Sequence, residues 1–129
     1  MNPNEQIKVI ELRNYLIKPN TRDRFIEYFK RHFVESQNAS GGFVLGTFRI
    51  KTEAQRFFWI RGFSEMNSRS RFLPEFYGGE VWKAFGAQAN EMMLEWHHVH
   101  LLKPLGEIKA KDFFTGKNVT IIDFGSREV

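Results

Sequence analysis

Four segments of this chain, at residues 7–17, 43–51, 56–63 and 94–103, have the composition and alternating pattern of β-strands. Side chains at successive positions of a strand point to opposite faces of a sheet. In these segments one alternating set is mostly aliphatic, and the other carries large rings interleaved with arginines. A sheet with one face in water would be polar on that face, so the sequence predicts a sheet covered on both faces.

Helical segments follow the first and the third of these strands, and a short hairpin connection joins the second to the third. Phe25, Phe29 and Phe33 recur every four residues, which predicts a helix with one apolar face and with Asn20 as its N-cap. Pro74 interrupts a second helical region, and a further helix follows a pair of glycines. The order β-α-β-β-α-β predicts the fold class α+β, as a ferredoxin-like domain with an antiparallel sheet and its helices on one face.

The two faces of this sheet are assigned by their side chains. We expect the aliphatic set to pack against the helices and the set of rings and arginines to form the open face. The residues expected on the open face are Glu11, Arg13, Tyr15, Arg49, Trp59, Arg61, Trp96, His98 and His100. Burying this face predicts a homodimer in which two sheets meet as a dimeric α/β barrel. One glutamate cannot neutralise three arginines, so the face is either a network that stabilises the dimer or a site for an anion.

The domain organisation follows from these elements. Residues 1–104 are expected to form the ferredoxin-like domain, and residues 105–129 a C-terminal extension. Within the extension, residues 118–124 (NVTIIDF) predict one more strand, which is not stable alone. This strand either adds to a sheet edge, reaches a partner, or begins a second repeat that this chain lacks.

Short motifs along residues 7–104 resemble those of the NIPSNAP family. They are ELRNYLIKP at 11–19, FFWIRGF at 57–63, FY at 76–77, WK at 82–83, ANEMM at 89–93, Val99, and LLKP at 101–104. The resemblance implies a dimeric α+β barrel, as in small monooxygenases and EthD-like proteins. Some members of the family carry two tandem repeats, which agrees with a second repeat starting in the extension. The last strand differs, because His97, His98 and His100 stand where the family usually has small polar residues and an asparagine.

The composition limits the cellular compartment and the kinds of binding partner that we expect. The chain has no cysteine, which fits a reducing compartment, and its first residues have no apolar signal segment. No apolar run approaches the roughly 20 residues that span a bilayer. The net charge of +4 is spread along the chain without a basic stripe. We therefore expect a cytoplasmic protein that binds itself, and neither a membrane nor a nucleic acid.

Polar residues among apolar neighbours indicate a candidate ligand pocket between helices and sheet. Its expected members are Asn14, His32, Tyr77, Trp82 and His97. The alternative is that Asn14 and His97 are hydrogen-bonded core residues. A small aromatic or acidic ligand would suit such a pocket.

Three functions remain open at this stage. The first is a small-molecule binding protein or cofactor-independent oxygenase-like enzyme, and the second is a homodimeric interaction module without chemistry. The third is a haem binder with His32 and His97 as candidate axial ligands. His98 and His100 have the spacing of metal ligands on a strand, or are neutral histidines at the dimer interface. We expect no cofactor, with haem and metal left as alternatives.

Overall fold

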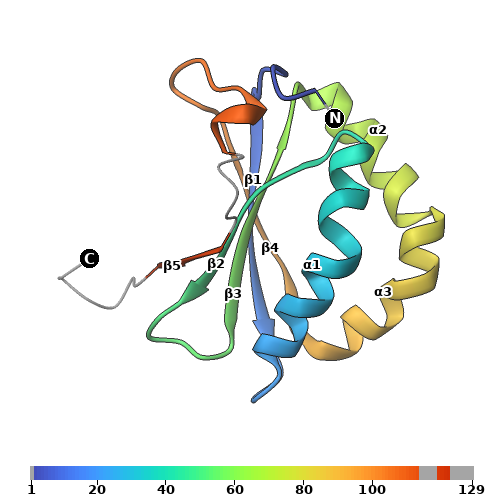
Figure 1. Cartoon of the computed structure of the whole chain (residues 1–129), viewed down its shortest axis with the longest axis vertical. Coiled ribbons are helices and arrows are strands. Elements are labelled where there is room, and N and C mark those ends of the chain that lie inside the picture. The colour runs from blue at the N-terminus through green and yellow to red at the C-terminus, as the bar shows by residue number, and fades with distance from the viewer. Residues whose placement is uncertain (1, 114–118, 123–129) are drawn as a thin grey trace.

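The computed structural model describes residues 2–113 and 119–122 and has the predicted α+β, ferredoxin-like architecture. Its elements are β1 (Val9–Ile17), α1 (Arg22–Ala39), β2 (Phe43–Ile50), β3 (Arg56–Phe63), α2 (Met66–Tyr77), α3 (Glu80–Met92), β4 (Met93–Leu102), a 3-10 turn (Ala110–Asp112) and β5 (Val119–Ile122). The strand order is β4-β1-β3-β2-β5. The first four strands pair antiparallel, and β5 pairs parallel with β2. All three α-helices lie on one side of the sheet (Figure 1).

The start of α1 differs from the prediction by one residue. Thr21, not Asn20, is the N-cap, and Asn20 has a φ of 62°. Asparagine enters this left-handed region more easily than most residues, so Asn20 closes the turn that follows Pro19. The phenylalanines of α1 are buried as predicted.

In β1 and β3 the faces of the sheet are the reverse of those expected. The rings of β1 and β3 pack against α1: the ring centroids of Trp59 and Phe29 are 4.8 Å apart, and those of Tyr15 and Phe25 are 6.2 Å apart. Glu11, Arg13, Arg61 and Trp96 also lie on this side, where they contact helical residues or line the space beneath the helices. Arg49 pairs with Asp23 of α1 at 3.0 Å.

The reason for this reversal is that the helices supply polar partners. Gln37 of α1 accepts a hydrogen bond from Arg61 at 2.7 Å, and Arg69 of α2 donates to Glu11 at 2.9 Å. Glu11, Arg61 and Arg69 therefore have ion-pair or hydrogen-bond partners within one chain.

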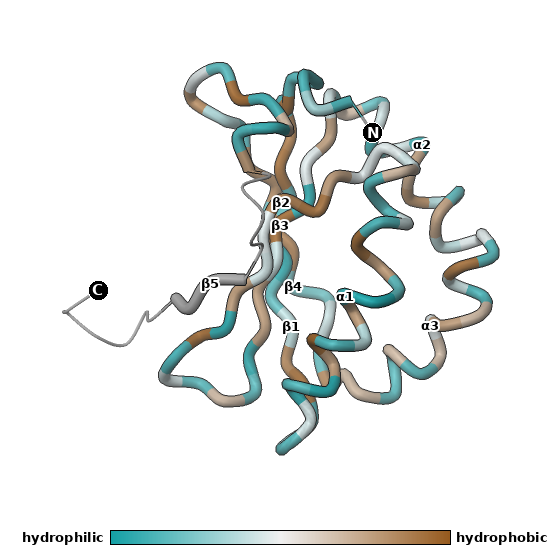
Figure 2. The backbone as a smooth tube through the Cα atoms, in the orientation of Figure 1, coloured by the Kyte–Doolittle hydropathy of each residue, from teal (hydrophilic) through white to brown (hydrophobic). Residues whose placement is uncertain are grey.

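The open face of the sheet is instead largely apolar, with Phe43, Phe48 and Phe58 beside its aliphatic side chains, and it is partly covered. At one end, Ile7, Ile10 and Leu45 form a small cluster with Ala110 and Ile108 from the segment after β4. Elsewhere this face carries the partly buried aliphatic side chains Leu12, Leu16 and Ile60 and the exposed Leu102. His98 and His100 do lie here, opposite Asn14 and Leu12 of β1. Figure 2 shows hydrophobic positions concentrated in the strands and alternating with hydrophilic positions along the helices.

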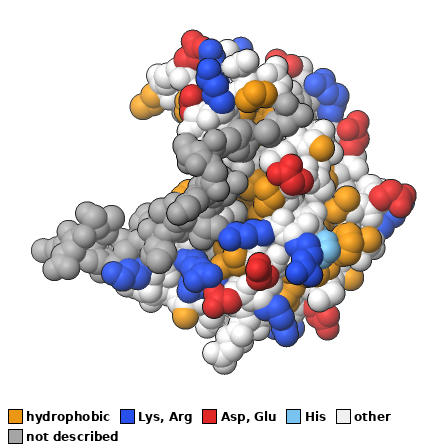
Figure 3. Space-filling model, viewed as in Figure 1, with side chains coloured by type: hydrophobic (Ala, Val, Ile, Leu, Met, Phe, Trp, Pro, Cys, Tyr) orange, Lys and Arg blue, Asp and Glu red, His pale blue; other side chains and the backbone are white. Residues whose placement is uncertain are grey.

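The charges of the surface are mixed in sign. In Figure 3, Lys and Arg side chains are interspersed with Asp and Glu over the visible face. Within the described residues, no helix is long and apolar enough to cross a membrane.

Candidate functional site

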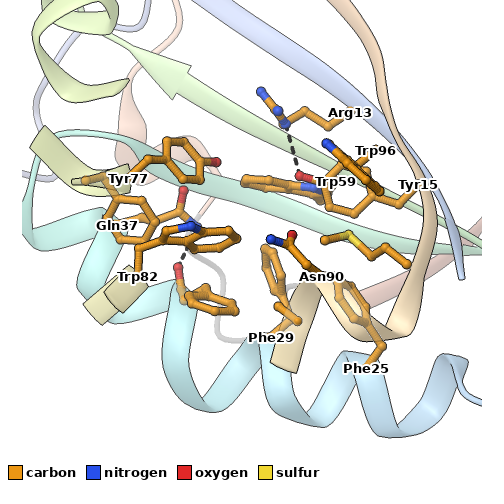
Figure 4. Close-up of a pocket in the computed structure, with 14 residues that line it drawn as sticks. Arg13, Tyr15, Phe25, Phe29, Gln37, Trp59, Tyr77, Trp82, Asn90 and Trp96 are labelled. Carbon is orange, nitrogen blue, oxygen red and sulfur yellow. Dashed lines mark hydrogen bonds between the residues drawn. The ribbon is translucent and has the colours of Figure 1, made fainter. Parts of the chain in front are cut away.

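A cavity of about 230 Å³ lies between the sheet and the helices. Its walls are mostly aromatic. Trp59 of β3 forms the sheet side, Phe25 and Phe29 of α1 face it, and Figure 4 shows Tyr77 and Trp82 on one flank with Tyr15 and Trp96 on the other. A second, more open hollow of about 560 Å³ is lined mainly by exposed polar residues. We take the first cavity as the site because ligand pockets are enclosed and largely apolar, with few polar groups.

Trp96 lies at the edge of the cavity. It belongs to β4, where the pairing with β1 shifts register between Asn14 and Leu16. Such a bulge re-aims side chains. The indole of Trp96 lines the cavity and is 48% exposed, so it stands between the cavity and solvent.

A cluster of charges borders the cavity. Glu11 is fully buried and pairs with three arginines. Arg61 donates to one carboxylate oxygen of Glu11. Arg13 and Arg69 donate to the other oxygen, at 3.1 and 2.9 Å. Three guanidinium groups and one carboxylate leave this cluster with an excess of positive charge.

The protonation states in this cluster follow from its contacts. Burial alone would raise the pKa of Glu11, but the charge and hydrogen bond of Arg61, together with Arg13 and Arg69, hold that pKa below its usual value. Glu11 is therefore ionised at neutral pH. Burial raises the pKa of Tyr15, so its hydroxyl stays protonated and accepts a hydrogen bond from Arg13 Nε at 3.2 Å.

Arg61 sits in a cage of rings. Its guanidinium carbon lies 4.9 Å from the centroid of Phe72, 5.0 Å from that of Trp59 and 5.8 Å from that of Tyr77. Cation–π contact and the hydrogen bonds to Glu11, Gln37 and Tyr77 offset much of the cost of burying this charge.

Three buried donors have no partner among the described residues. They are Nε of Arg49, Nη2 of Arg61 and Nε1 of Trp59. An unsatisfied buried donor is costly. Trp59 lines the cavity with its ring, whereas Arg49 and Arg61 are not part of the lining.

The five residues expected in a pocket are only partly brought together. Tyr77 and Trp82 line the cavity. Asn14 faces the other side of the sheet, where Arg56 donates to its side chain at 3.4 Å, because the two faces are the reverse of those assumed. His32 stacks on Phe85 at 3.8 Å outside the cavity lining, and its pKa is lowered by burial and by Arg31. His97 is exposed on β4 and lies against His98.

Gln37 and Asn90 line the cavity and were not predicted as site residues. Gln37 lies four residues after Phe33 and so continues the buried stripe of α1, which is the one sequence signal that could have indicated it. Asn90 has no comparable signal.

The candidate metal and haem ligands are not arranged as a site. Within residues 2–113 and 119–122, no group of three or more His, Cys, Asp or Glu could hold a metal ion. His98 has Glu95 as a neighbour at 3.5 Å. His32 and His97, the candidate axial ligands, do not line the cavity.

The fold and the cavity define a class of ferredoxin-like α+β domains with a pocket between the helices and the sheet. The model of the NIPSNAP family matches residues 10–106. This chain belongs to the NIPSNAP family, as its sequence motifs predict.

Solved structures that are similar to this chain agree with the ferredoxin-like fold described above. A NIPSNAP family protein from Agrobacterium tumefaciens has a TM-score of 0.69 at 14% identity, covering 81% of this chain and 91% of the other. An uncharacterized NIPSNAP domain protein from Burkholderia xenovorans has a TM-score of 0.69 at 12% identity, covering 76% and 95%. A putative antibiotic biosynthesis monooxygenase from Nitrosomonas europaea has a TM-score of 0.60 at 10% identity, covering 76% and 99%. No curated protein matches this chain in sequence.

Proposed function

We propose that this protein binds a small aromatic molecule in the cavity between its helices and its sheet. The observation that carries the proposal is a cavity of about 230 Å³ whose walls are rings from β1, β3, β4 and all three α-helices. Rings that face a cavity from several directions stack on a flat guest or meet it edge-on. Pockets for drug-sized ligands are about 300–1,000 Å³, so this smaller cavity suits a guest of one or two rings.

An interaction module without chemistry would have a filled interior, so the cavity favours a ligand over that alternative. A cofactor-independent oxygenase-like reaction on the bound molecule is the enzymatic form of the same proposal. Its support is the fold shared with a protein named as a putative monooxygenase, which is analogy at the level of the fold.

We also propose that the protein is a homodimer, built through the aliphatic face of the sheet. Leu12, Leu16 and Ile60 lie on this face without a layer of helices over them, and Leu102 beside them is 44% exposed. Apolar surface of this kind is stabilised when two copies bring the same face together around a two-fold axis. The proposed dimer interface is therefore the open face of the sheet, and not the surface of rings and arginines that the sequence led us to expect.

Filling the cavity tests the binding proposal. Ala89 of α3 is buried and lines the cavity, whereas Ala87 of the same helix is exposed and does not. The probe is 2-naphthol, a neutral compound with two rings, titrated against tryptophan fluorescence. We expect Ala89→Leu to weaken binding by about tenfold or more and Ala87→Leu to leave it unchanged. Binding that is equal in both variants, with both folded by circular dichroism, would contradict the proposal.

A further inference from the structure

The charge cluster beside the cavity indicates what kind of aromatic molecule it takes. Glu11 is shared by Arg13, Arg61 and Arg69, so the described cluster carries more positive than negative charge. Such an excess in a poorly solvated region is unfavourable unless an anion joins it.

Arg13 is the member of the cluster that reaches the cavity. Its side chain lines the cavity and is 13% exposed, whereas Arg61 is fully buried behind the rings and is not part of the lining. Figure 4 shows Arg13 over Trp59 at one side of the cavity, and its guanidinium carbon is 5.6 Å from the indole centroid.

The hydrogen bonds of Arg13 leave part of its guanidinium group available. Nε donates to the hydroxyl of Tyr15, and Nη1 donates to Glu11. Within the described residues, no hydrogen bond involves Nη2 of Arg13. A planar guanidinium that is already oriented by two bonds offers its remaining N–H groups in a fixed direction, at little cost in side-chain entropy.

From these observations we infer that the ligand is a small aromatic carboxylate, with its ring between the aromatic walls and its carboxylate bound by Arg13. This inference rests on the proposed function and narrows it to one class of compound. Arg13 binds the anion, and Glu11 and the hydroxyl of Tyr15 position Arg13.

The experiment compares probes of one shape that differ in charge. Isothermal titration calorimetry measures 2-naphthoate, 2-naphthol and 2-naphthamide against the wild type. We expect 2-naphthoate to bind about tenfold or more tightly than the two neutral probes, with the gap narrowing as salt is raised. Equal affinity for all three would overturn the inference and leave the proposed function standing. Absence of binding by all three would overturn both.

Variants test whether Arg13 causes the preference for 2-naphthoate over the neutral probes. Arg13→Gln is expected to remove most of the difference in affinity between 2-naphthoate and 2-naphthol. Arg31→Gln, an exposed arginine of α1 outside the cavity, should retain the full preference. If Arg13→Gln unfolds, Arg13→Lys keeps the charge but not the planar fork, and should retain only part of the preference. A preference that survives in whichever Arg13 variant folds would overturn the assignment.

Discussion

Glu11 is the counter-ion of three arginines in the core, and its replacement by glutamine is expected to be strongly destabilising. Glutamine has nearly the same shape, so the change removes the charge and leaves Arg61 fully buried without a carboxylate. Breaking a buried ion pair by removing one partner costs about 3–5 kcal/mol. Arg13 and Arg69 are partly exposed, so solvent screens their attraction to Glu11. We therefore assign most of the lost stability to Arg61.

Chemical and thermal denaturation followed by circular dichroism measure this loss. We expect the free energy of unfolding to fall by about 3–5 kcal/mol and the midpoint of thermal unfolding by roughly 10–20 °C. The control is Glu53→Gln, because Glu53 is 56% exposed and its carboxylate lies 4.0 Å from Arg56, a surface pair worth at most about 1 kcal/mol. A loss below about 1 kcal/mol for Glu11→Gln would refute the buried ion cluster.

The pH dependence of the free energy of unfolding is a second test of the ionisation of Glu11. The folded-state pKa of Glu11 lies below its ordinary value of 4.5. A depressed carboxyl pKa contributes stability that is fully present above the unfolded pKa and is lost as pH falls through the folded pKa. The difference in stability between wild type and Glu11→Gln should therefore be constant near neutral pH and shrink below 4.5. A difference that stays constant down to acid unfolding would show that Glu11 is not ionised in the fold.

Three further predictions concern the open face, the turn after α1 and the core. Leu12→Arg should leave the protein monomeric in light scattering where the wild type is the proposed homodimer, because it places a charge on the open face of the sheet. Gly41→Ala should cost about 1 kcal/mol in urea denaturation, because Gly41 has a φ of 92°, whereas Gly106→Ala, which has open space and no such φ, should be neutral. Phe29→Ala should cost about 3–5 kcal/mol by the same method, because Phe29 is 3% exposed and packs on Trp59.

The sequence predicts the elements of this fold well because their signals are local. The alternating strands and the four-residue spacing of Phe25, Phe29 and Phe33 require no knowledge of distant residues. The family motifs agree with them, and the family match confirms the assignment. The one-residue discrepancy at the start of α1 is of the usual size for such boundaries.

The faces of the sheet were not predictable in the same way, because alternation separates two faces without saying which one the helices cover. That choice depends on partners far along the chain, such as Gln37 and Arg69, which satisfy Arg61 and Glu11. The mostly aliphatic set predicts the helix-facing side, but the strand pattern carries no information about the polar partners that the helices supply. The same error placed Asn14 in the predicted pocket and left Arg13 out of it.

The irregular pairing of β4 has a consequence for association between chains. In the described part of the sheet β4 is an outer strand, and a regular outer strand offers its free backbone groups to any extended peptide. The register shift near Trp96, together with the charge of Glu95 and the exposed ring of His98, makes β4 a poor template for another strand. The bulge in β4 that directs the Trp96 indole to the cavity therefore also disfavours edge-to-edge aggregation along this strand.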